Sequence, residues 1–259
     1  MLAKAAVRRS DVRMQSSSES QPLPVDDAAE VGHVHADLSG GWLRAATFGA
    51  MDGLVTNVSL VAGVGAAGAS AGVIVTAGVA GLVAGAFSMA LGEYASVSTQ
   101  NEAIAKEVAV ETREIAENPG AEIAELAEMF VGMGMSDGTA AAAATEVHRD
   151  QDRAVRLHVT QELGLDPEEN AGPVAAAVSS FVMFSIGAVV PLLPYLLGYP
   201  SLFAGLLAGA IGLLVAGALA TFFTATTWWW GAIRQLLYGA LAAGATYAVG
   251  TALGVGLTP

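Results

Sequence analysis

Residues 72–95, GVIVTAGVAGLVAGAFSMALGEYA, run directly into residues 96–117, SVSTQNEAIAKEVAVETREIAE, with no proline in either part. The first part is apolar, and its length suits a helix of about 20 residues that crosses a hydrocarbon core of about 30 Å. The second part is charged and consists largely of good helix formers. At 1.5 Å per residue, the two parts together predict a single helix of about 70 Å. We expect Asn118-Pro119-Gly120 to end this helix, because proline and glycine interrupt helical hydrogen bonding.

Four further apolar stretches resemble the first. Of the 259 residues, 54% are hydrophobic and 14% are charged, and the mean hydropathy is +0.55. The additional predicted spans are residues 43–65, 174–197, 202–225 and 234–256. Residues 174–259 contain one charged side chain, Arg234, which a lipid environment explains simply. The sequence therefore predicts an all-α polytopic membrane protein with five transmembrane helices and a helical domain between the second and third.

The distribution of Lys and Arg predicts the orientation. These residues concentrate in the N-terminal tail and in residues 96–173, and they are absent from the connections 66–71 and 198–201. Positive charge usually remains on the cytosolic side, so the N-terminus and the domain at 96–173 should be cytosolic. The predicted organisation is a disordered tail (1–41), two spans (42–95), the acidic domain (96–173) and three spans (174–259). The Ala- and Gly-rich composition of the chain favours a bacterial source, so the predicted location is the bacterial cell membrane. In a eukaryote, the vacuolar membrane is the alternative.

The segment between the second and third spans is strongly acidic. It contains 16 acidic and 5 basic residues between Glu102 and Glu169. Three short helices are predicted near residues 120–132, 136–149 and 150–163, with Ser136 as the N-cap of the middle one. The excess negative charge disfavours nucleic acid as a partner and favours cations.

Carboxylates in this acidic domain recur at helical spacing. Glu111 and Glu114 share one helix face, as do Glu122 and Glu125, and an antiparallel turn would bring the two pairs together. The candidate metal ligands are Glu111, Glu114, Glu122, Glu125, His158 and Glu162. Carboxylates with one imidazole suit Mn²⁺, Fe²⁺ or Zn²⁺. The alternative interpretation is a set of solvated acidic helix faces.

The sequence lacks the motifs of several other kinds of metal and nucleotide site. There is no cysteine, so thiolate ligation and disulfides are excluded. No Glu-x-x-His occurs within residues 96–173, and the sequence contains neither His-Glu-x-x-His nor a P-loop motif. We expect no enzymatic activity and no prosthetic group, and energy for transport would come from a gradient or a partner.

The spans themselves contain rare polar residues. Asp52 lies within the apolar run Met51–Val64, where a carboxylate costs at least about 2.5–3.5 kcal/mol and usually marks an ion or proton path. Met89 and Glu93 lie one helical turn apart near the cytosolic end of the second span. A thioether beside a carboxylate suits a transition metal in transit, although a membrane methionine more often serves packing. The predicted transport pathway comprises Asp52, Met89 and Glu93.

Several of these motifs resemble those of the vacuolar iron transporter family. The matching segments are residues 52–57 (DGLVTN), 81–98 (GLVAGAFSMALGEYASVS) and 162–165 (ELGL), with Pro191-Leu-Leu-Pro194 and Thr246-Tyr247 in the later spans. The resemblance implies a five-span homodimer with a pathway near the dimer interface and a cytosolic domain that collects divalent metal. It implies pathway roles for Asp52 and Met89 and metal ligation by Glu111, Glu114, Glu122, Glu125 and Glu162. Related sequences can place methionines just before the last of these glutamates, whereas this chain has His158-Val-Thr-Gln-Glu162.

The resemblance also implies a function. Members move Fe²⁺, and often Mn²⁺, out of the cytosol in exchange for protons. We therefore expect a divalent metal exporter that works by proton antiport, whose partners are metal ions, protons, the lipid bilayer and a second copy of the chain. One alternative is a membrane-tethered buffer or sensor that binds metal without moving it. Another is a channel without proton coupling.

Overall fold

The computed structural model describes residues 41–164, 172–223 and 226–257. These residues form helices and turns without strands, and they include five helices long and apolar enough to cross a membrane. The all-α fold class with five candidate spans is therefore confirmed. The predicted disordered tail lies, except for Gly41, outside the described residues. The five candidate spans are Gly41–Ala66, Ala71–Glu117, Pro173–Leu196, Leu202–Ala220 and Trp228–Gly254.

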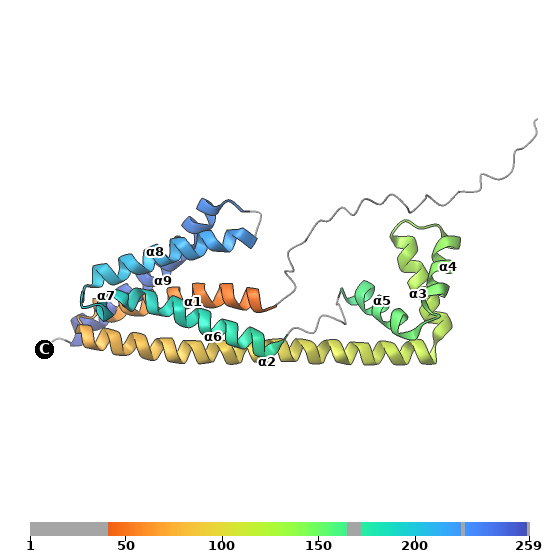
Figure 1. Ribbon diagram of the computed structural model, residues 1–259, viewed down its shortest axis with the longest axis horizontal. Coiled ribbons are helices and arrows are strands. Elements are labelled where there is room, and N and C mark those ends of the chain that lie inside the picture. The colour runs from red at the N-terminus through yellow and green to blue at the C-terminus, as the bar shows by residue number, and fades with distance from the viewer. Residues whose placement is uncertain (1–40, 165–171, 224–225, 258–259) are drawn as a thin grey trace, which may run out of the picture. The chain divides into compact units, whose positions relative to one another are not determined.

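The second span and the charged segment after it form one uninterrupted helix. This helix, α2, runs from Ala71 to Glu117 and has 47 residues (Figure 1). It ends at Asn118, whose backbone N–H donates to the carbonyl oxygen of Glu114, and α3 (Pro119–Gly132) begins at the next residue. The predicted extension of the helix beyond the membrane-spanning length, and its end at Asn118-Pro119-Gly120, agree with the structure.

The later spans depart from simple single helices. The third comprises α6 (Pro173–Val189), the 3₁₀ turn η2 (Val190–Leu192) and the short α7 (Leu193–Leu196). Pro191 and Pro194 have no backbone N–H to donate, which explains the interruption. Helix α8 (Leu202–Ala220) continues into the 3₁₀ turn η3 (Thr221–Phe223), and the predicted end at residue 225 lies outside the described residues.

The last span begins earlier than predicted. Helix α9 runs from Trp228 to Leu257, whereas the sequence predicted a start at residue 234. Trp228, Trp229 and Trp230 are exposed in its first turn, and Arg234 follows within the helix. Apolarity alone places the start of a span too late here, since aromatic residues at a membrane interface extend the helix beyond its apolar core.

Helix α1 (Gly41–Ala66) is central to the packing of the spans and contacts α2, α6, α8 and α9. It approaches α6 so closely that a Cβ added at Gly53 would collide with the carbonyl oxygen of Phe184. Asn57, fully buried in α1, donates from Nδ2 to the carbonyl oxygens of Gly78 in α2 and Ala188 in α6, at 3.2 and 2.5 Å. Small residues and one amide side chain thus hold three helices together.

The acidic segment folds into α3, α4 (Asp137–Val147) and α5 (Gln151–Leu163), whose bounds lie within two residues of those predicted. Ile115, Val155 and Val159 pack α5 against the end of α2. Leu126 and Phe130 of α3 pack against alanines of α4. Ser136 occupies the N-cap position of α4, but its hydroxyl lies 2.9 Å from Thr139 Oγ1 and makes no capping bond to the backbone.

Substitution of Gly187 tests the close contact between α1 and α6. A Cβ at Gly187 would collide with the backbone carbonyl of Ala50, whereas a Cβ at Gly92 of α2 meets nothing within 4 Å. We expect Gly187→Ala to destabilise the fold by about 1–3 kcal/mol through overpacking. Its thermal unfolding midpoint in detergent, followed by tryptophan fluorescence, should fall below that of the wild type. Gly92→Ala should leave the midpoint unchanged or raise it, and equal midpoints for the two variants would contradict the packing described here.

Candidate metal centre

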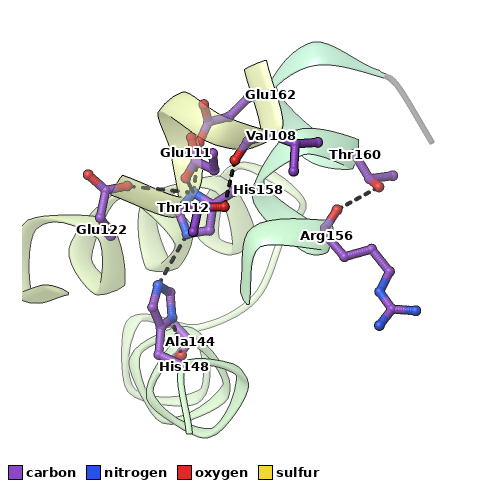
Figure 2. Close-up of polar contacts among 10 residues, drawn as sticks. All are labelled: Val108, Glu111, Thr112, Glu122, Ala144, His148, Arg156, His158, Thr160 and Glu162. Carbon is purple, nitrogen blue, oxygen red and sulfur yellow. Dashed lines mark hydrogen bonds and ion pairs between the residues drawn. The ribbon is translucent and has the colours of Figure 1, made fainter. Parts of the chain in front are cut away.

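The side chain of His158 in α5 is fully buried and faces three carboxylates (Figure 2). Its Nδ1 lies 2.7 Å from Glu162 Oε1, 3.2 Å from Glu111 Oε1 and 3.8 Å from Glu122 Oε2. Glu111 comes from α2, Glu122 from α3 and Glu162 from α5, one turn after the histidine. One ligand atom each from Glu111, Glu122 and His158 lies within 4.8 Å of the others, which is close enough for one metal ion. We refer to Glu111, Glu122, His158 and Glu162 together as the carboxylate cluster.

Local structure brings the three helices together. Pro119 occupies the first helical position of α3, where its missing N–H does no harm, and this puts Glu122 in the first turn. Asp150 is the N-cap of α5, and its carboxylate accepts from the backbone N–H of Arg153. Gly164, in the left-handed conformation, is the C-cap. The apolar contact of Ile115 with α5 lies one turn beyond Glu111 and fixes the position of His158.

The cluster holds more negative charge than its histidine can neutralise. Nδ1 can donate one hydrogen bond, and Glu162 at 2.7 Å is its nearest acceptor. Oε1 of Glu111 is buried and has no hydrogen-bond donor among the residues that the structure describes. Burial, reinforced by the charge of Glu162, raises the pKa of Glu111 to about 7. Burial also raises the pKa of Glu122, so both carboxylates would gain from a bound cation.

The donor set fits a divalent transition metal. Carboxylate oxygens and one imidazole nitrogen are ligands that Mn²⁺, Fe²⁺ and Zn²⁺ accept. Two of the carboxylates and the histidine are buried, so they are not the solvated acidic faces that the sequence left as an alternative.

The other two candidate ligands lie at the edge of this cluster. Glu114 and Glu125 are exposed, in contrast to Glu111 and Glu122. After burial, the charge of Glu125 is the next largest cause of the raised pKa of Glu122, and Glu114 contributes as well. The structure therefore brings them near the cluster without placing them in its buried part.

Sequence reasoning missed His148. This residue follows the last turn of α4, and its Nε2 lies 3.3 Å from Nε2 of His158 (Figure 2). The two rings are close to perpendicular, at 86°. The nine residues between the two histidines include a turn between helices, so helical spacing gave no signal for this contact.

The three candidate pathway residues, Asp52, Met89 and Glu93, have separate contacts. Glu93 pairs with Arg44 of α1 at 3.3 Å, a partner that the sequence did not predict. Met89 packs against the buried cluster of Ala86, Phe184 and Ala188. Asp52 is exposed on α1 of the single chain and has Thr56 as a side-chain hydrogen-bond partner. Among the described contacts, none joins Asp52 to Met89 or Glu93.

Comparison with known proteins gives the family. Residues 43–251 match the model of the VIT family, which covers most of the chain. The chain belongs to the VIT family. The vacuolar iron transporter of Acanthamoeba castellanii is 35% identical over 213 residues, covering 81% of this chain and 78% of that protein. Vacuolar iron transporter 1 of Oryza sativa subsp. japonica is 28% identical over 239 residues, 90% and 95% of the two chains, and that of Arabidopsis thaliana is 27% identical over 212 residues, 81% and 85%.

Membership of the VIT family confirms the resemblance that the motifs at residues 52–57 and 81–98 carry. Both motifs lie inside the matched region. The names of these relatives describe them as vacuolar transporters of iron.

The raised pKa of Glu111 predicts a pH-dependent metal response. With a folded-state pKa of about 7 against an ordinary 4.5, this residue favours the metal-free fold at low pH. That contribution is lost as the pH rises through about 7, while a metal ion that displaces the proton binds more tightly over the same range. We expect the increase in unfolding midpoint caused by Mn²⁺ to be larger at pH 7.5 than at pH 5.5.

Glu111→Gln should reduce both the Mn²⁺-induced increase in the unfolding midpoint and the dependence of that increase on pH. Glu117→Gln, which removes an exposed carboxylate from the same helix, is the matched control and should behave like the wild type. An identical response of the two variants to Mn²⁺ and pH would show that Glu111 is not the titrating ligand.

Proposed function

We propose that this protein is a divalent transition-metal transporter that exports Fe²⁺ or Mn²⁺ from the cytosol in exchange for protons. The observation that carries the proposal is the convergence of Glu111, Glu122 and Glu162 on the buried His158, in a domain continuous with a membrane helix. Membership of the VIT family and relatives named vacuolar iron transporters support it. Zn²⁺ would fit the same donor set.

The proposed path follows helix α2. Glu111 lies 18 residues after Glu93, or about 27 Å along a helix at 1.5 Å per residue. In this proposal the carboxylate cluster binds metal from the cytosol and raises its concentration beside the membrane. The ion then passes Glu93 and Met89 and reaches Asp52.

The ion pair between Arg44 and Glu93 bears on this path. The side chain of Glu93 is 13% exposed and that of Arg44 is 56% exposed, so the carboxylate is the more enclosed partner. A metal ion that binds Glu93 must compete with the guanidinium. The opening of this pair would therefore accompany entry of the ion into the spans.

Proton exchange follows from carboxylate chemistry. A protonated carboxylate is a poor metal ligand, so protons arriving from the opposite side would release the ion from Asp52. The same carboxylate would then carry a proton in the reverse direction. This coupling requires no ATP-binding motif, and the sequence has none.

Asp52 also supports a homodimer. Its side chain is exposed on α1 of the single chain, and a carboxylate that faces lipid is costly. A second copy that covers this face of α1 would put the two Asp52 residues on a path between protomers. The distribution of Lys and Arg supports a cytosolic acidic domain, in a bacterial cell membrane or a vacuolar membrane.

The second candidate function is a membrane-tethered metal buffer or sensor. The buried carboxylate cluster favours it, because this site lies outside the apolar part of α2 and would bind metal whether or not transport follows. An intramembrane carboxylate at Asp52 has no role in a buffer, and we therefore prefer the transporter.

Transport by Asp52→Asn protein in proteoliposomes distinguishes these functions. We expect wild-type protein to accumulate Mn²⁺ when an opposing proton gradient is imposed, with matching proton movement reported by an internal pH dye. Asp52→Asn should bind Mn²⁺ at the carboxylate cluster but transport it at least about tenfold more slowly, because an amide neither exchanges a proton nor neutralises the ion. Asp137→Asn, which removes an exposed carboxylate at the start of α4, should transport normally.

Three outcomes would contradict parts of the proposal. A normal rate for Asp52→Asn would remove that residue from the mechanism. Binding without accumulation by the wild type would favour the buffer or sensor. Accumulation that is independent of the proton gradient would indicate a channel.

A further inference from the structure

His148 lies outside the carboxylate cluster but contacts the imidazole at its centre. We propose that His148 is a positioning residue of the metal site, which accepts a hydrogen bond from Nε2 of His158 and thereby directs Nδ1 of His158 toward the carboxylates and the metal. This inference rests on the proposed metal site and adds a residue that carries no ligand role of its own.

The hydrogen-bond partners decide which nitrogen carries each proton. Nδ1 of His148 lies 2.8 Å from the carbonyl oxygen of Ala144. A carbonyl oxygen only accepts, so Nδ1 of His148 must carry the hydrogen and its Nε2 must offer a lone pair in the neutral ring. Nε2 of His158, 3.3 Å away, is then the donor. The resulting chain runs from Nε2 of His158 to Nε2 of His148, and from Nδ1 of His148 to Ala144.

This arrangement selects the ligand tautomer of His158. A neutral imidazole has one N–H and one lone pair, and a metal ligand needs the lone pair on the metal side. Acceptance by His148 favours the tautomer with the hydrogen on Nε2 of His158, whose lone pair on Nδ1 then faces Glu111, Glu122 and Glu162. Glu162, 2.7 Å from Nδ1, favours the other tautomer, which a bound metal ion would exclude. Metal-bound histidines usually donate their second N–H to such a partner, which fixes the ring and raises its basicity.

The ring of His148 is positioned by its contact with Ala144. Ala144 is fully buried in the apolar contact between α3 and α4, and its carbonyl also accepts from the backbone N–H of His148 at 3.1 Å. His158 is fully buried as well, so an N–H there without an acceptor would be costly. Helix α4 thus positions a residue of the metal site although it supplies no carboxylate to it.

Without His148, the tautomer that Glu162 favours would predominate. His158 would then carry its hydrogen on Nδ1 and donate it to Glu162, 2.7 Å away, and this nitrogen would no longer bind metal. Loss of such supporting partners typically lowers metal affinity by about 10–100-fold. We expect a decrease of this size in His148→Phe, which fills the space but offers no acceptor.

The test uses the full chain in detergent micelles, with Zn²⁺ binding measured by calorimetry and the histidine ring nitrogens observed by ¹⁵N NMR. In the wild type, Nδ1 of His158 should move to a metal-bound shift while its Nε2 remains protonated. His148→Gln restores an acceptor oxygen and should recover affinity to near the wild-type value. Arg149→Gln is the matched control, because it breaks only an exposed ion pair with Glu146 on the same helix end.

Each opposing result is distinct. Wild-type affinity in His148→Phe, together with weakened binding in Glu111→Gln, would overturn the role of His148 and leave the metal site intact. Unchanged affinity in both variants would overturn the metal site and this inference with it. A metal-bound shift on a ring nitrogen of His148 would make it a direct ligand and also contradict the proposal. The NMR spectrum of the wild type alone tests the tautomer, even if a variant fails to fold.

Discussion

Three carboxylates around one buried imidazole nitrogen are the constraint on which this structure depends. Nδ1 of His158 can donate a single hydrogen bond, yet it faces Glu111, Glu122 and Glu162. Within the described ranges, a buried oxygen of Glu111 has no hydrogen-bond donor. Burial of so much negative charge is unfavourable unless a proton or a cation compensates it. In the proposed function, a proton and a metal ion would alternate in supplying that compensation, which is the property a proton-coupled metal carrier needs.

Continuity of α2 couples this site to the membrane. The same helix contains Glu111 and, 18 residues earlier, Glu93 and its neighbour Met89. Asn57 ties α1 to α2 and α6 through two backbone carbonyls, so the helix is anchored among the spans. In the proposed function, this continuous helix would place the metal site on an extension of a span, about 27 Å along the helix from Glu93.

The sequence predicted local features well and contacts between distant residues less well. The long helix through residue 117 and its end at Asn118 follow from helix propensity and from Pro119, and the spacing of Glu111 and Glu122 across that turn predicted their meeting. The contact between His148 and His158 depends on how α4 packs on α3, which apolar periodicity does not determine. The pairing of Arg44 with Glu93 joins two spans, and no short-range spacing encodes it.

In the proposed function, Glu111, Glu122 and His158 bind the transported ion. The most direct measurement is anomalous diffraction from crystals of the full chain soaked in Mn²⁺. We expect an anomalous peak among these three side chains, within coordination distance of Nδ1 of His158 and of at least one oxygen each of Glu111 and Glu122. A Mn²⁺ peak elsewhere on the chain, with no peak among these residues, would contradict it.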